Sequence, residues 1–137
     1  MSEGYGFGQS AAAFLIAFVA AGLFTVAFKL IYQAATPYHE RTLIREGNVA
    51  AAITLGAALL GYVLPLASAL EHTVSLPEFA AWALLAGVIQ IVAFTVVRLA
   101  VMRDFADRIG RGETAAAVYM ASVSLCVGLL NAAAMSA

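Results

Sequence analysis

Residues 47–69 form an unbroken apolar stretch without a charged side chain, GNVAAAITLGAALLGYVLPLASA. As an α-helix rising about 1.5 Å per residue, this stretch is long enough to cross a hydrocarbon core of roughly 30 Å. With it, the chain contains four apolar runs, at 10–35, 48–70, 78–101 and 114–136. Of the 137 residues, 64% are hydrophobic and only 11% are charged. The sequence therefore predicts an all-α, polytopic membrane protein with four transmembrane helices.

The sequence also resembles itself. A shift of 65 positions superposes identical residues without a gap, for example Gly47 on Gly112, Leu60 on Leu125 and Phe14 on Phe79. This self-similarity predicts two tandem two-helix repeats, at 1–72 and 73–137, that enter the membrane from the same side and are therefore parallel repeats. Chance matching in an alanine-rich chain is the alternative interpretation.

The seven cations gather at two of the three connections between the apolar runs. Each lies in the first or third connection, or in the last turns of the helix that enters it: Lys29, Arg41, Arg45, Arg98, Arg103, Arg108 and Arg111. Because positive residues of short loops stay on the cytoplasmic side, we expect these two connections in the cytoplasm and both termini in the periplasm. The formal net charge of −1 offers no basic surface for nucleic acid, so no nucleic-acid partner is expected.

Several residues predict where the helices begin, end and bend. Asn48 and Thr114 are positioned to cap the second and fourth helices, Thr114 together with Glu113, because side-chain oxygens accept from unpaired N–H groups there. Pro37 is expected to end the first helix. Pro65 falls inside the second helix, where its ring presses on the carbonyl of Gly61 and favours a kink.

Polar side chains within the apolar runs are costly unless they are paired, so they are candidate site residues. Gln90 and Arg98 lie on one stripe of the third helix. Thr25 corresponds to Gln90 in the first repeat, and Asn131 supplies a second amide from the fourth helix. Two interpretations stay open for this polar stripe: hydrogen bonds that hold the helices together, or the lining of a path for a solute or ion.

The cytoplasmic connections carry a second group of candidates, with Glu40 beside Arg41 and Arg45 in the first and Arg108 and Arg111 in the third. Arginines next to helix N-termini favour anionic lipid headgroups or an acidic partner surface. The alternative is that these arginines only set the topology.

Nothing in the chain has the pattern of an active site or of a metal or cofactor site. His39 and His72 fall on opposite sides of the membrane in the predicted topology, so they cannot share a metal. No other metal-ligand spacing, Gly-rich phosphate loop or nucleophile with an adjacent base occurs. We therefore expect a non-enzymatic protein that needs neither a metal nor a cofactor.

The strings TPYHERTLIREGNVAAA, GAALLGYVLPLASA, VIQIVAFTVVRLAVM and GLLNAAAM resemble the small bacterial inner-membrane YjfL proteins, which contain two copies of a domain of unknown function. The resemblance covers essentially the whole chain. It implies a multi-pass protein of the bacterial inner membrane, with a role in envelope maintenance beside a peripheral membrane protein of the phage-shock type. Lys29 departs from the family pattern and carries no functional expectation.

Two functions are expected from these observations. The first is an oligomeric module for envelope maintenance or membrane stress that recruits a cytoplasmic partner, with copies associating through small-residue faces such as those at Gly22 and Gly87. The alternative is a channel or transporter for a small solute or ion along the polar stripe. Because four helices cannot enclose a wide pore alone, both functions favour a homo-oligomer in the lipid bilayer.

Overall fold

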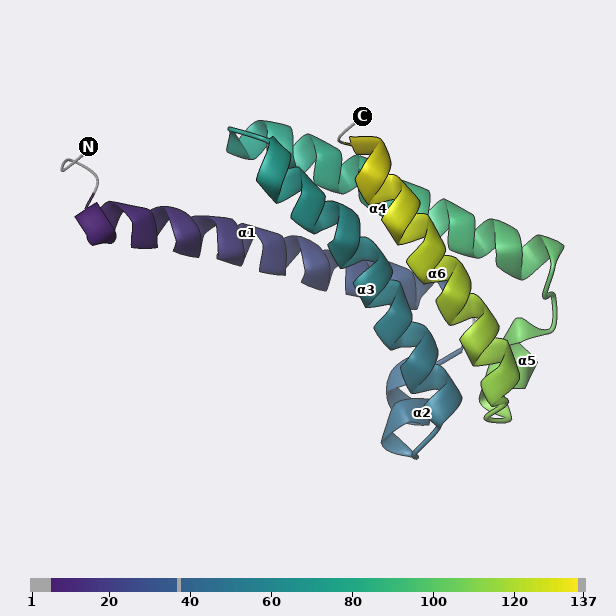
Figure 1. Cartoon of the computed structure of the whole chain (residues 1–137). Coiled ribbons are helices and arrows are strands. Elements are labelled where there is room, and N and C mark those ends of the chain that lie inside the picture. The colour runs from purple at the N-terminus through teal and green to yellow at the C-terminus, as the bar shows by residue number, and fades with distance from the viewer. Residues whose placement is uncertain (1–5, 37, 136–137) are drawn as a thin grey trace.

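The computed structural model describes residues 6–36 and 38–135, and their regular structure is entirely helical (Figure 1). The helices are α1 (Gly6–Ala35), α2 (Glu40–Arg45), α3 (Val49–His72), α4 (Leu76–Ala100), α5 (Phe105–Gly110) and α6 (Thr114–Met135). The helices α1, α3, α4 and α6 are long and apolar enough to cross a membrane. The predicted all-α fold with four candidate spans is therefore confirmed.

The short helices α2 and α5 lie within the two connections that the sequence analysis treats as polar loops. Phe105 and Ile109, one turn apart on α5, are both fully buried. Leu43 of α2 packs against the same hydrophobic core. Because each short helix places an apolar side against the bundle, the two connections fold onto the spans instead of extending into solvent.

Helix starts and turn glycines repeat in the structure at the spacing of 65 residues that the sequence suggests. The starts of α2 and α3, at 40 and 49, are matched by the starts of α5 and α6, at 105 and 114. Gly47 and Gly112 both have a positive φ, of 88° and 76°, and close the turn after each short helix, a conformation that favours glycine. This recurrence supports the interpretation of two similar hairpins, while the duplication itself stays a prediction.

Helix α3 occupies the centre of the bundle and packs along α6, with α4 and the C-terminal part of α1 on its other sides. Figure 1 shows the N-terminal half of α1 projecting away from the other helices. It also shows α2 and α5 at one end of the bundle, away from the α3–α4 connection and both chain ends. We call the end with α2, α5 and the adjoining helix termini the basic end, because all seven cations belong to it.

The backbones of α3 and α6 touch where Gly61 faces Gly128. A methyl group at Gly128 would overlap the carbonyl oxygen of Gly61 and lie 2.8 Å from its Cα. A methyl group at Gly61 would lie 2.5 Å from the carbonyl oxygen of Ser124 and 2.8 Å from Nε2 of Gln90. Since such distances are shorter than any real contact of a methyl carbon, only glycine fits at both positions.

The helix ends follow the predicted signals in part. Asn48 caps α3, because its Oδ1 accepts from the N–H of Ala51 at 2.9 Å. Thr114 is the first residue of α6, and the carboxylate of Glu113 before it pairs with Arg108 and Arg111; the cap expected at these two residues stays a prediction. The structure adds a cap that the sequence analysis omitted, since Oγ of Ser75 accepts from the N–H of Glu78 at the start of α4.

The prolines are placed as follows. Pro65 is buried within α3, which continues through it from Val49 to His72. The predicted kink at Pro65 stays a prediction. Pro37 lies outside the described residues, although α1 ends two residues before it, at Ala35.

The contact between α3 and α6 leads to a prediction about stability. We expect Gly128→Ala to lower the free energy of unfolding by about 1–3 kcal/mol, because the added methyl group forces the two backbones apart. Gly56→Ala is the matched control on α3, since a methyl group there meets no atom within 4 Å. The control should leave the free energy unchanged or raise it by up to about 1 kcal/mol through better helix propensity.

The measurement is reversible unfolding of both variants in the same lipid or detergent. Equal effects of the two substitutions would show that α3 and α6 are not in backbone contact at Gly61 and Gly128.

Candidate functional site

The two amides of the polar stripe are buried and donate to backbone carbonyls of neighbouring helices. Nε2 of Gln90 donates to the carbonyl of Ser124 on α6 at 3.4 Å, and Nδ2 of Asn131 donates to the carbonyl of Ala86 on α4 at 3.3 Å. The two side chains are 4% and 8% exposed. Both therefore act as links between α4 and α6 beside the Gly61–Gly128 contact, and Oε1 of Gln90 is buried without a hydrogen-bond partner.

Thr25 and Arg98, the other members of the predicted stripe, do not form hydrogen bonds of this kind between the described helices. The hydroxyl of Thr25 donates to the carbonyl of Ala21 in its own helix at 2.9 Å. Arg98 lies in the last turn of α4 at the basic end, where its Nε is buried without a hydrogen-bond partner. The structure thus joins Gln90 and Asn131 through the α4–α6 contact but does not bring Thr25 or Arg98 into the same group of hydrogen bonds.

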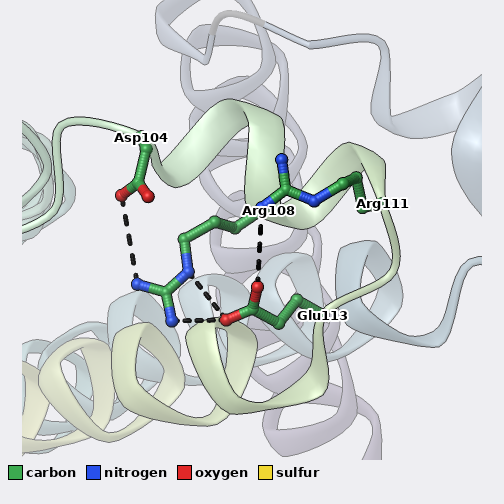
Figure 2. A network of polar contacts seen from close by, with 4 residues as sticks. All are labelled: Asp104, Arg108, Arg111 and Glu113. Carbon is green, nitrogen blue, oxygen red and sulfur yellow. Dashed lines mark hydrogen bonds and ion pairs between the residues drawn. The ribbon is translucent and has the colours of Figure 1, made fainter.

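At the basic end, the arginines of α5 and the following turn are neutralised within the chain (Figure 2). Nε of Arg108 donates to Oε1 of Glu113 at 2.7 Å, and its guanidinium also lies 3.9 Å from Asp104. Arg111 approaches the second carboxylate oxygen of Glu113 at 3.7 Å. These contacts raise the pKa of Arg108 and lower the pKa of Glu113, chiefly through the hydrogen bond between them. Arg108 is consequently less available to an external anion.

The arginines of α2 are in the opposite situation. Arg41 and Arg45 are both exposed, and neither forms an ion pair with any residue in 6–36 or 38–135. They border a cavity of about 350 Å³ together with Lys29 and Gln33 of α1. Neither Lys29 nor Gln33 was among the site residues predicted from the sequence. Their spacing of one helical turn, with a polar group at each position, was the available signal.

Glu40, which the sequence analysis grouped with the loop residues available to a partner, is buried. Its side chain is 2% exposed, and Oε1 lies 3.5 Å from the hydroxyl of Thr36. Burial raises the pKa of Glu40 to about 7, partly opposed by the Thr36 hydroxyl and the charge of Lys29. The expected surface contact at Glu40 is therefore wrong, because α2 turns its first residue into the bundle.

Glu40 belongs to a buried group of polar atoms at the junction of α1, α2 and α4. Oε2 of Glu40 and Nε of Arg98 are buried without a hydrogen-bond partner, and the buried hydroxyl groups of Tyr32 and Tyr38 lie close to each other and to Glu40. The ring of Tyr32 packs on Phe94, with centroids 5.0 Å apart, and the ring of Tyr38 packs near Phe105. Burial also raises the pKa of Tyr38. Sequence reasoning missed this group because the residues come from three separate elements.

A second cavity, of about 250 Å³, lies between α1 and α4 and is almost wholly apolar. Phe28 and Tyr62 belong to its lining and stack with ring centroids 4.3 Å apart, and the hydroxyl of Tyr62 donates to the carbonyl of Ala83 at 3.1 Å. Gly87 leaves room for these rings, since a methyl group there would touch Tyr62 at 3.4 Å. The described residues contain no cluster of three or more His, Cys, Asp or Glu side chains that could hold a metal ion.

Comparison with known proteins identifies relatives over most of the chain. The family model described as Domain of Unknown Function (DUF350) matches residues 6–135. The chain is 40% identical over 111 residues to the "UPF0719 inner membrane protein YjfL" of Escherichia coli strain K12, which covers 81% of this chain and 83% of that protein. The protein of the same name from Escherichia coli O157:H7 matches equally well. No solved structure gives a significant match.

These matches agree with a chain of four apolar helices that has an inner-membrane relative of almost its own length. The resemblance noted from the sequence is confirmed, and so is the membrane setting that it implies. The chain belongs to the DUF350 family, as a membrane protein related to the inner-membrane protein YjfL.

Proposed function

We propose that the protein is a non-enzymatic inner-membrane module that recruits an acidic cytoplasmic partner at its basic end. The observation that supports this proposal is the contrast between the two short helices. Arg108 of α5 is held by Glu113 and Asp104, whereas Arg41 and Arg45 of α2 are exposed and have no ion pair within the described residues. Unpaired cations on a surface attract a complementary negative surface.

The fold holds these two arginines in place. They are one helical turn apart, so they project from the same face of α2. The opposite side of α2 is anchored by buried Glu40 and by Leu43, which packs on the core. Because the helix is already ordered, a partner loses less conformational entropy on binding than it would on a flexible loop.

The proposed partner is a peripheral membrane protein of the phage-shock type, as the family resemblance implies, with carboxylates that meet Arg41 and Arg45. In this proposal the basic end faces the cytoplasm and both chain termini face the periplasm, following the positive-inside rule. The role is envelope maintenance or the response to membrane stress.

We further propose that copies of the chain associate through α1. Only Phe28 and Tyr32 of this 30-residue helix are buried within the chain. The exposed side includes Phe14 and Phe18, whose rings stack at 5.8 Å. Aromatic and small side chains on a helix that projects from its own bundle favour packing against another helix in the bilayer.

A channel or transporter is the second candidate, and the geometry favours it less. Its polar lining would be Gln90 and Asn131, whose amides are already engaged with the carbonyls of Ser124 and Ala86. A conduit would have to form between copies or after rearrangement of the α4–α6 contact.

The recruitment proposal predicts that charge reversal on α2 abolishes partner binding. In nanodiscs of uncharged phosphatidylcholine, the variant Arg41→Glu with Arg45→Glu should bind the purified phage-shock-type protein at least about tenfold more weakly than the unaltered chain, because like charges then meet. Arg103→Glu with Arg111→Glu is the matched control, since it reverses two charges at the same end of the bundle. Surface plasmon resonance gives the affinities. Equal losses in the two variants, or no loss on α2, would contradict the proposal.

The association proposal predicts a mass larger than that of one chain. Light scattering of the detergent-purified protein should give a multiple of 14.2 kDa for the protein component. Phe14→Ala with Phe18→Ala should shift this mass toward one chain, because the aromatic contact surface of α1 is lost. Val74→Ala, in the exposed α3–α4 connection, is the control and should leave the measured mass unchanged. A single-chain mass at every concentration would rule out association through α1.

A further inference from the structure

The cavity at the basic end is surrounded by cations from two helices. Lys29 and Gln33 lie one turn apart on α1, and Arg41 and Arg45 lie one turn apart on α2. Ile44 and Leu55 complete the lining and supply its apolar part. Because residues one turn apart share a helix face, three positive charges and one amide are directed at the same space of about 350 Å³.

The charge around this cavity is not balanced by the chain. Every ion pair found among residues 6–36 and 38–135 involves Arg108 or Arg111, so Lys29, Arg41 and Arg45 have none. The charge of Lys29 does act on the buried carboxyl of Glu40. Because burial raises the pKa of Glu40 to about 7, protonation of this carboxyl near neutral pH removes part of its negative charge, and it offsets only part of the positive charge. The cavity therefore favours an anion.

An exposed apolar strip leads from the cavity toward the middle of α1. Val19, Gly22 and Val26 continue the helix face of Lys29 at spacings of three and four residues. Val19 and Val26 are 54% and 55% exposed, and a methyl group on Gly22 would meet no atom within 4 Å. From Val19 to Lys29 the strip extends roughly 15 Å, which is half the thickness of a bilayer core. Its length thus matches one lipid leaflet.

We propose that Lys29, Gln33, Arg41 and Arg45 form a binding site for the headgroup of an anionic glycerophospholipid, with an acyl chain along Val19, Gly22 and Val26. Arginine guanidinium groups pair with phosphate oxygens in bidentate fashion, and lysine extends its ammonium from the apolar region to the headgroup level. The Gln33 amide adds a neutral donor. Basic pockets between membrane helices on the cytoplasmic side commonly hold acidic headgroups.

The apolar strip distinguishes a lipid from a soluble anion. Free phosphate or a soluble acidic peptide would use the cations alone, whereas a phospholipid also covers the strip. The inference rests on the proposed function, because it uses the same arginines and names the ligand that reaches them from the membrane side. Lys29 and Gln33 belong to the lipid site alone, which allows the two proposals to be separated.

The test is native mass spectrometry of the detergent-purified protein titrated with dioleoylphosphatidylglycerol or dioleoylphosphatidylcholine. We expect the anionic lipid to bind at least about fivefold more tightly, and Lys29→Gln and Arg41→Gln each to reduce that preference about fivefold, the effect of one basic residue near an anionic surface. Arg103→Gln is the matched control at the same end of the bundle and should retain the preference. Equal binding of the two lipids would overturn the inference.

Two further measurements distinguish a lipid headgroup from a free anion and show whether the variant protein is folded. Gly22→Leu narrows the strip without changing charge and should weaken lipid binding while helical circular dichroism stays unchanged; unaltered lipid binding would contradict the acyl-chain contact. Millimolar inorganic phosphate should not displace phosphatidylglycerol, and displacement would indicate a site for free anions instead.

The same variants separate this inference from partner recruitment. Lys29→Gln should lose the lipid preference yet still bind the partner in phosphatidylcholine nanodiscs. Absence of a lipid preference with intact partner binding overturns only the lipid site. A lipid preference without partner binding overturns only the proposed recruitment.

Discussion

The backbone contact between Gly61 and Gly128 is the constraint on which the rest of the structure depends. Within a bilayer, apolar side chains gain nothing from leaving lipid for protein, so helices associate through close packing and hydrogen bonds. The two glycines allow α3 and α6 to touch, and around them Gln90 and Asn131 reach carbonyls of the partner helices. Further from the crossing, the hydroxyl of Ser68 donates to the carbonyl of Ala132 at 3.1 Å. The glycine contact and the Ser68 hydrogen bond thus join the two hairpins, and the two amides hold α4 and α6 together within the second hairpin.

This packing has a consequence for the basic end, where the two short helices are joined. The side chain of Asn48 caps α3 through its oxygen and donates from Nδ2 to the carbonyl of Ile109 in α5 at 2.8 Å. The hairpins are similar in backbone but not in charge, because Glu113 follows α5 at the position where Asn48 follows α2. Glu113 pairs with Arg108 and Arg111, whereas no carboxylate within residues 6–36 and 38–135 forms an ion pair with Arg41 or Arg45. The carboxylates of Asp104 and Glu113 beside the arginines of the second hairpin therefore distinguish its ion-paired surface from the unpaired arginines of α2.

Sequence patterns predicted the four spans because uninterrupted apolar runs of this length have no other stable environment. The caps at Asn48 and the amides at Gln90 and Asn131 were also visible as polar residues in apolar surroundings. The burial of Glu40 could not be predicted from the sequence, since a carboxylate in a polar connection is expected to face water. Only the three-dimensional position of α2 encloses this side chain. The cavity at Lys29 likewise depends on how α1 and α2 meet, which no local spacing specifies.

The central claim is that two hairpins cross the membrane in the same sense and place the basic end in the cytoplasm. The most direct measurement is labelling of single cysteines in intact cells with a thiol reagent that cannot cross the inner membrane, in a Cys126→Ala background that removes the one native cysteine. Val74→Cys, at a position that is 99% exposed in the α3–α4 connection, should be labelled from outside. Arg41→Cys and Arg103→Cys should be labelled only after the membrane is permeabilised. Labelling of either basic position in intact cells, with Val74→Cys protected, would contradict the account.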